Sequence, residues 1–148
     1  MLKLLGALVA LLALTYLDVQ PGLAASSYCM TRDEAITVIA HKADVEYGGR
    51  SASKWRIWQI ADRESGLSSC WPNGSIKISY TNDHSLLQLN PGGVWRNCGV
   101  NPYCNRPDLI DDPYLQIDVM LNYYLVYGDL CPWNPDPRGN YMPGCGYR

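Results

Sequence analysis

Six cysteines, all of them after residue 28, constrain this 148-residue sequence more than any other feature. An even number of cysteines in a short exported chain is typical of a domain that disulfides hold together. A metal site is the weaker interpretation, because no C-x-x-C pair occurs and only His41 and His84 could add nitrogen ligands. We therefore expect disulfides throughout, with no metal and no cofactor.

Sequence alone does not determine which cysteines pair. Pairing those that lie close in the chain, and then the two that remain, gives a working scheme. It consists of Cys98–Cys104, Cys131–Cys145 and Cys29–Cys70.

The N-terminus has the pattern of a secretory signal. A positive start at Lys3 precedes an almost wholly apolar run over 4–17, which Pro21 and small residues follow. The run is shorter than the roughly 20 residues that span a membrane. We therefore expect residues 1–25 to be a signal peptide and 26–148 to be one secreted, extracellular or periplasmic domain. An uncleaved membrane anchor and a virion-associated protein are the alternatives.

Charge and aromatic content narrow the classes of ligand. The net charge of −2 provides no basic surface for nucleic acid, which we do not expect as a partner. The chain has no Phe but five Trp and eleven Tyr. Trp and Tyr combine an apolar ring with a hydrogen-bonding edge, which suits sugar rings, although most of these residues are expected to serve packing.

Capping signals predict two antiparallel helices at the start of the domain. Thr31 and Glu34 form a capping box for a helix over about 32–47. A second helix is expected over about 53–65, with Gly66 ending it. The short connection favours antiparallel packing, which would bring Cys29 close to Cys70.

The rest of the chain is expected to be irregular apart from one further helix. This helix begins at Asp112-Pro113 and ends at Gly128. Alternation over 76–80 predicts a small β-hairpin, and 85–90 is a candidate brief helix. Residues 131–148 form an irregular, cysteine-bearing tail. The expected fold class is α+β, mainly α, with disulfides holding the domain together.

Two carboxylates suggest glycosidic chemistry. Cleavage of a glycosidic bond needs one carboxyl that donates a proton and a second negative group that supports the cationic carbon. Glu64 ends the second predicted helix, where the helix dipole and apolar neighbours would favour its protonated form. Asp83 precedes the next apolar run. The structural alternatives are an exposed Glu64 paired with Arg63 or Lys54, and an Asp83 that only shapes a turn.

Three motifs in order resemble the lysozyme-like superfamily, especially lytic transglycosylases and lysozymes of bacteria and phages. They are ADRESGL at 61–67, DHSLLQLNP at 83–91 and DPYLQIDVMLNYYL at 112–125. The resemblance implies a lysozyme-like fold with the small β-hairpin beside a substrate cleft.

The resemblance also implies roles for individual residues. Glu64 matches the catalytic acid, and Asp83 falls where animal-type lysozymes carry their second carboxylate. The matched substrate-binding positions are Ser65, Ser85, Leu86, Gln88, Asn90 and Tyr123. Ser85 replaces the motif's glycine and Gln116 replaces its asparagine. Ser85 would narrow the site or reposition its loop if close backbone approach to sugar needs the glycine.

Aromatic residues that flank the motifs are candidates for binding sugar rings. Trp71, Tyr80 and Trp95 are expected as subsites, and Trp133 is expected to close the far side of the cleft. Trp55 and Trp58, which are three residues apart on the second predicted helix, are expected in the core.

The expected function is cleavage of the β-1,4 bond between N-acetylmuramic acid and N-acetylglucosamine in peptidoglycan glycan strands, by a monomeric muramidase or lytic transglycosylase. Hydrolysis and 1,6-anhydro ring formation both remain open. The first alternative is a non-catalytic glycan- or cell-wall-binding protein on the same fold. The second is an exported, disulfide-bonded structural or inhibitory protein.

Overall fold

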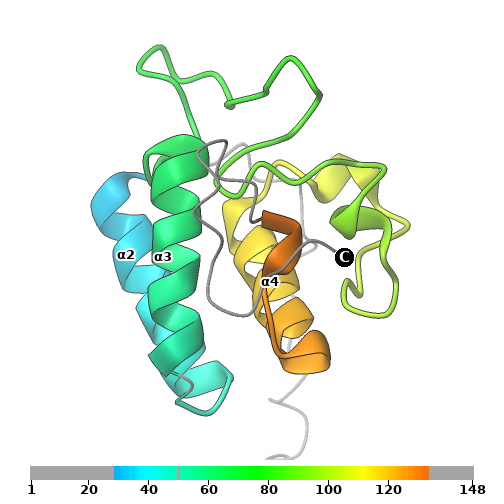
Figure 1. Cartoon of the computed structure of the whole chain (residues 1–148). Helices are drawn as coiled ribbons and strands as arrows, with labels where there is room; N and C mark the ends of the chain where they lie inside the picture. The colour runs from blue at the N-terminus through cyan, green and yellow to red at the C-terminus, as the bar shows by residue number, and fades with distance from the viewer. Residues whose placement is uncertain (1–28, 50, 134–148) are drawn as a thin grey trace, which may run out of the picture.

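Three α-helices dominate the described part of the chain. The computed structural model describes residues 29–49 and 51–133, so the expected signal peptide and most of the tail lie outside it. The helices are α2 (Arg32–His41), α3 (Ser51–Ser65) and α4 (Pro113–Tyr127), as Figure 1 shows. A π-helical turn, Lys42–Glu46, extends α2. Short 3₁₀ turns lie at Val94–Arg96, Pro107–Leu109 and Cys131–Trp133.

The predicted helix pair is confirmed. The Thr31 side chain accepts a hydrogen bond from the Glu34 amide, and the Glu34 carboxylate accepts one from the Thr31 amide, which completes the capping box. Helices α2 and α3 lie side by side (Figure 1). The disulfide Cys29–Cys70 joins the residues before α2 to those after α3, as their antiparallel packing predicts.

Two of the expected disulfides are present. Besides Cys29–Cys70, Cys98 pairs with Cys104 across a separation of 6 residues. The third expected pair includes Cys145, which lies outside the described residues.

Helix α4 forms with the predicted ends and supplies much of the core. The Asp112 carboxylate accepts hydrogen bonds from the Tyr114 and Leu115 amides, and Gly128 ends the helix with a left-handed φ of 74°. Its buried side chains include Ile117 and Met120. They share the core with α2 and α3 side chains and with Leu86, Leu87 and Leu89 of the connecting segment.

The predicted β-hairpin is not confirmed, because only isolated bridges occur between α3 and α4 in the described residues. These join Cys70 to Ile76, Ile78 to His84, and His84 to Leu89. Side chains compete with strand pairing here: the side-chain Oδ1 of Asn73 accepts from the Ser75 amide, and the Ser79 hydroxyl accepts from the Thr81 amide. This segment forms the long excursion beyond the ends of α2 and α3 in Figure 1.

The candidate helix over 85–90 is wrong. Residues 85–88 form turns, Leu89 pairs in an isolated bridge, and Ser85 (φ 61°) and Gln88 (φ 49°) both adopt the left-handed backbone region. A right-handed helix cannot pass through two such residues.

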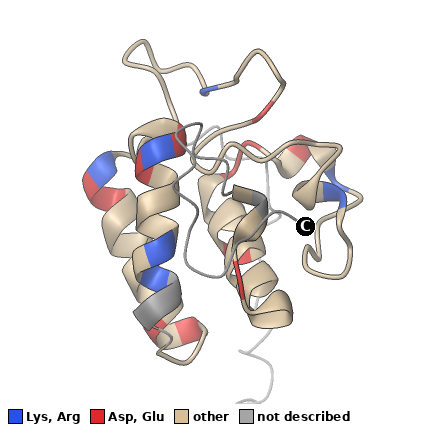
Figure 2. Cartoon of the chain, viewed as in Figure 1, with Lys and Arg blue, Asp and Glu red and all other residues tan. Residues whose placement is uncertain are grey.

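Charged residues of both signs are interspersed along α2 and α3, whereas α4 is almost free of charge (Figure 2). Asp118 is the one charged residue within α4, and its carboxylate lies 2.7 Å from the Lys42 ammonium. Among the described helices, none is both long enough and apolar enough for a membrane span.

A candidate glycan cleft at the end of helix α3

Glu64 occupies the last turn of α3 and faces two adjoining hollows. Its side chain is 28% exposed. The larger hollow, here the main cleft, has a volume of about 540 Å³. It is lined by Glu64, Ser79, Asp83, Gln88, Leu89, Asn90, Gly93, Val94 and Trp133.

The second hollow, here the side cleft, has a volume of about 380 Å³ and continues from the main cleft. The two share Glu64, Ser79 and Gln88. The remaining lining residues are Arg63, Ser65, Gly66, Trp71, Lys77 and Ile78. Glu64 therefore borders both hollows.

The Asp83 carboxylate is held in place on the main-cleft wall by a set of donors. The Ser79 and Thr81 hydroxyls donate to Oδ2, and the Asn90 amide donates to Oδ1 at 3.0 Å. Burial acts to raise the pKa of Asp83, but these hydrogen bonds and the nearby His84 outweigh burial, so its pKa lies below the ordinary value. Asp83 is thus an ionised carboxylate near neutral pH.

Glu64 and Arg63 form an ion pair at 2.8 Å, which is the arrangement that the structural alternative expects. The same guanidinium donates to the Trp133 carbonyl. Lys54, the other expected partner, pairs with Asp44 instead. Glu64 therefore lies in the cleft and is also paired, and a proton-donor role requires the Arg63 guanidinium to leave Glu64 Oε1.

Gln88 reaches the cleft because of its unusual backbone. With φ at 49°, its side chain folds back so that Nε2 donates to the Ser85 carbonyl at 2.7 Å. The contact holds the amide of Gln88, which lines both hollows together with Glu64. Asn90 lines the main cleft and braces Asp83, so its amide serves the cleft wall.

Other predicted positions fall at different depths. Ser65 and Trp71 line the side cleft, and Trp71 is 52% exposed. Tyr123 does not line either hollow, but it packs edge-on against Trp133 of the main cleft, with ring centroids 5.3 Å apart. Trp133 lines the main cleft as expected.

Several predicted contacts need correction. Leu86 and Trp95 are buried in the core, at 0% and 1% exposure, so neither offers a surface to sugar. The indole nitrogen of the buried Trp95 donates a hydrogen bond to the Arg106 carbonyl. Tyr80 is fully exposed but does not line either hollow.

Ser85 also differs from its expected role. Its side chain is fully buried and donates to the Asp111 carbonyl at 3.0 Å, so it does not narrow the cleft. Its left-handed φ of 61° is a conformation that glycine adopts with less strain than any other residue. The glycine of the motif that Ser85 replaces would suit the same backbone.

Among the cleft residues that sequence reasoning missed, Ser79 and Lys77 have polar side chains. Ser79 lines both hollows, and Lys77 lines the side cleft with its ammonium 5.2 Å from the Trp71 ring centroid. Burial lowers the pKa of Lys77, and its ammonium donates to the Ser65 carbonyl. The alternation that suggested a strand over 76–80 already placed Lys77 and Ser79 on one side, which was the available signal.

Among the described residues, no group of three or more His, Cys, Asp or Glu side chains could hold a metal ion. No family model, curated protein or solved structure matches the chain. The lysozyme-like fold and function therefore stay predictions, and the cleft geometry is the observation on which a function can be argued.

Proposed function

We propose that this protein cleaves the β-1,4 bond between N-acetylmuramic acid and N-acetylglucosamine in peptidoglycan, with Glu64 as the proton donor. One observation supports the proposal most: Glu64 and Asp83, from separate parts of the chain, line the same cleft of about 540 Å³. Two carboxylates on opposite sides of a bound sugar are what glycosidic cleavage requires.

In this mechanism the two carboxylates have different tasks. Glu64, once released from Arg63, takes up a proton from water and then gives it to the bridging oxygen as the bond to the sugar carbon breaks. Asp83 stays ionised, since its hydrogen bonds lower its pKa, and supports the positive charge that develops on that carbon. Arg63 keeps the Trp133 carbonyl as a second partner when it leaves Glu64.

Completion of the reaction takes one of two routes. In hydrolysis, Glu64 removes a proton from water and the resulting hydroxide bonds to the sugar carbon. In transglycosylation, Glu64 removes the proton of the muramic acid 6-hydroxyl, whose oxygen closes a 1,6-anhydro ring. Mass analysis distinguishes the routes, because the hydrolytic product contains one more water.

The test is peptidoglycan clearing by wild type and Glu64→Gln. General acid catalysis contributes about 10²–10⁴-fold, so we expect Glu64→Gln to lose at least about 100-fold in rate. Glu46→Gln is the matched control, because Glu46 is an exposed carboxylate paired with Lys42 outside both hollows. Clearing by Glu64→Gln at the rate of wild type would remove Glu64 from the mechanism.

A non-catalytic glycan-binding protein is the second candidate, and the Arg63–Glu64 ion pair favours it. An ion-paired carboxylate cannot donate a proton, although it can accept hydrogen bonds from sugar hydroxyls. Cosedimentation with insoluble peptidoglycan separates the two candidates. Binding without clearing by wild type supports the second, and clearing that depends on Glu64 supports the first.

A further inference from the structure

Helix α3 has a second exposed face that the cleft does not use. Trp55, Trp58, Gln59 and Asp62 follow one another at the i, i+3, i+4, i+7 spacing of a single helix face. The buried residues Ile57, Ile60 and Ala61 follow the same spacing toward Glu64. At about 100° per residue, these two faces lie on nearly opposite sides of α3.

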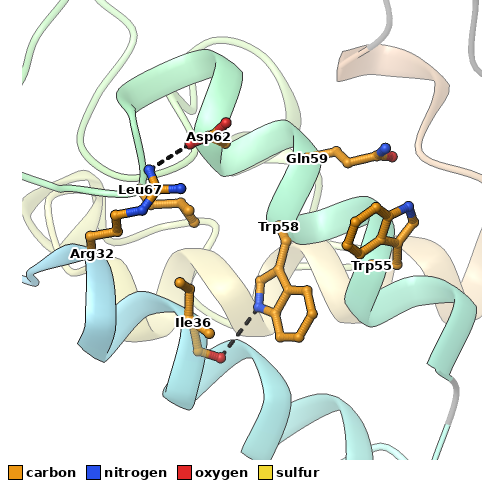
Figure 3. Close-up of a pocket in the computed structure, with 7 residues that line it drawn as sticks. All are labelled: Arg32, Ile36, Trp55, Trp58, Gln59, Asp62 and Leu67. Atoms are coloured by element: carbon orange, nitrogen blue, oxygen red, sulfur yellow. Dashed lines mark hydrogen bonds and ion pairs between the residues drawn. The ribbon is translucent and has the colours of Figure 1, made fainter.

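The exposed face contains a pocket of about 260 Å³, here the tryptophan pocket. Its walls are Arg32 and Ile36 of α2, the four α3 residues named above, and Leu67. Figure 3 shows the side chains of both helices around it. None of these residues lines the main or the side cleft.

The two tryptophans differ in their roles. The Trp58 indole nitrogen donates to the Ile36 carbonyl at 3.3 Å, which fixes its half-buried ring between the helices (Figure 3). Trp55 packs edge-on against Trp58, with centroids 6.2 Å apart, and is 59% exposed. The prediction that Trp55 belongs to the core is therefore wrong. Trp55 therefore presents an aromatic ring to solvent at the edge of the pocket, where a ligand could cover it.

Planar polar groups surround the apolar floor. The Arg32 guanidinium bonds the Asp62 carboxylate at 2.8 Å through one nitrogen and one oxygen, and both side chains are more than half exposed. The guanidinium thus keeps further donors and the carboxylate a further oxygen for a ligand. The Gln59 amide, also exposed, makes no hydrogen bond to another described side chain or backbone group.

We propose that the tryptophan pocket is a second glycan-binding site, which takes an N-acetylated hexosamine unit of the same polymer that the cleft cleaves. This assignment rests on the proposed function for the identity of the polymer. The Trp55 ring would stack on the apolar face of the sugar. Arg32, Asp62 and Gln59 would bind its hydroxyl and amide groups, and the acetyl methyl would contact Ile36 and Leu67.

Charge and composition favour a glycan over other occupants. A nucleic acid would need unpaired cations, whereas Arg32 is paired with Asp62 and the chain is net negative. An apolar helix of a partner protein would bury the Arg32–Asp62 pair, which costs free energy that a sugar's hydroxyls recover through hydrogen bonds.

The test measures binding to insoluble peptidoglycan by cosedimentation, in the Glu64→Gln background so that the polymer stays intact. We expect Trp55→Ala to weaken binding about tenfold and Gln59→Ala to weaken it less. Val126→Ala is the control, because Val126 is an apolar α4 residue with 58% exposure that lies outside all three hollows. Since Trp55 is exposed, the variant should fold, and Gln59→Ala provides a second probe if it does not.

A second readout separates this proposal from the cleft. With Glu64 restored, Trp55→Ala should cleave short soluble oligosaccharides at the wild-type rate but clear insoluble peptidoglycan more slowly. Unchanged cosedimentation of Trp55→Ala overturns the second site, even if cleavage depends on Glu64. If Trp55→Ala loses binding to phospholipid vesicles that wild type binds, and retains peptidoglycan binding, the second glycan site is overturned in favour of a membrane-binding surface. If binding to peptidoglycan depends on Trp55 but wild type shows no cleavage, the second glycan-binding site is supported and the proposed enzymatic function is contradicted.

Discussion

Ser85 combines a backbone conformation that favours glycine with a side-chain contact that glycine cannot make. Its φ of 61° costs a non-glycine residue roughly 1 kcal/mol or more. Its hydroxyl donates to the Asp111 carbonyl in a partly buried bond that contributes about 1 kcal/mol. The two effects are similar in size and opposite in sign.

Substitutions at Ser85 should therefore separate strain from hydrogen bonding. Ser85→Gly relieves the backbone and loses the bond, so we expect a free energy of unfolding within about 1 kcal/mol of wild type. Ser85→Ala keeps the strain and also loses the bond, so it should be less stable than Ser85→Gly by about 1 kcal/mol. Urea unfolding measures both, and an alanine variant as stable as the glycine variant contradicts the strain argument.

Asp83 should make the stability of the protein depend on pH. Its pKa in the folded state lies below the ordinary value, so the folded state favours the ionised form. That stability is present above the ordinary pKa of about 4 and is lost as the pH falls through the lower, folded value. Melting temperatures of wild type and Asp83→Asn should therefore converge on acidification below about pH 4. A constant difference across that range would show that the charge of Asp83 does not matter to folding.

Exposure was the least predictable property of individual residues. The sequence predicts Trp55 in the core, but its ring is 59% exposed. It predicts Trp95 on the surface of the cleft, but that side chain is 1% exposed. Helical spacing shows which residues share a face but not which neighbour covers that face. Trp95 is covered by residues around Arg106, whose carbonyl accepts its indole hydrogen bond.

At the scale of elements, one buried amide connects α4 to the cleft loop. Gln116 is fully buried; its Oε1 accepts from the Leu87 amide at 2.8 Å, and its Nε2 donates to the His84 and Ile110 carbonyls at 2.7 Å each. These contacts hold the loop that carries Gln88 and Asn90 against α4. The loop has little regular secondary structure of its own, so it depends on this side chain.

Gln116→Leu should remove that support. It leaves the buried Leu87 amide and the Ile110 carbonyl without their partner, whereas the His84 carbonyl keeps its bond from the Leu89 amide. Each lost partner costs about 1 kcal/mol or more, so we expect a loss of about 2 kcal/mol in urea unfolding. Gln116→Asn introduces the residue of the lysozyme-like motif, which keeps the amide but is one methylene shorter. Its free energy of unfolding should lie between those of wild type and Gln116→Leu. Hydrogen exchange of the Leu87 amide should quicken in both variants. Exchange and unfolding like those of wild type in Gln116→Leu would mean that the loop is held by its apolar residues alone.

Helices with local end signals were predictable and the segment between them was not. The ends of α2 and α4 follow from Thr31, Asp112 and Gly128, which act on backbone groups within a few residues. The connecting segment is instead held by contacts distant in sequence, such as Gln116 to Leu87. No local pattern encodes these contacts. The sequence therefore predicted a hairpin and a brief helix over 85–90 that the structure does not contain.

For the molecule as a whole, the two described disulfides should contribute unequally. Cys29–Cys70 closes a separation of 41 residues and Cys98–Cys104 one of 6. In the chain-entropy account the longer loop restricts the unfolded chain more, which gives about 4 kcal/mol against about 2 kcal/mol. Replacing each pair by serines should lower stability in that order, as measured by denaturant unfolding. The reverse order would indicate that the loop around Cys98 depends on its disulfide for native structure.

The candidate site was predictable in chemistry more than in geometry. Glu64, Asp83 and Gln88 were named from sequence, and the structure brings them to one cleft. The Arg63–Glu64 ion pair and the braces on Asp83 depend on rotamers and on the turn at Ser79, which spacing does not specify. The tryptophan pocket depends on how α2 packs against α3 and was not predicted.

Helix α3 is one continuous α-helix from Ser51 to Ser65 and contains neither proline nor glycine, two of the usual causes of a kink. Trp55 and Glu64 are consequently parts of one stiff rod, whose diameter of about 10 Å sets the offset between its two sides. Under the two proposals, a straight strand lying along one side cannot touch the other. The protein would bind one glycan strand at the tryptophan pocket while it cleaves a neighbouring strand in the cleft. Its rate of cleavage would then depend on the spacing between strands in the cell wall.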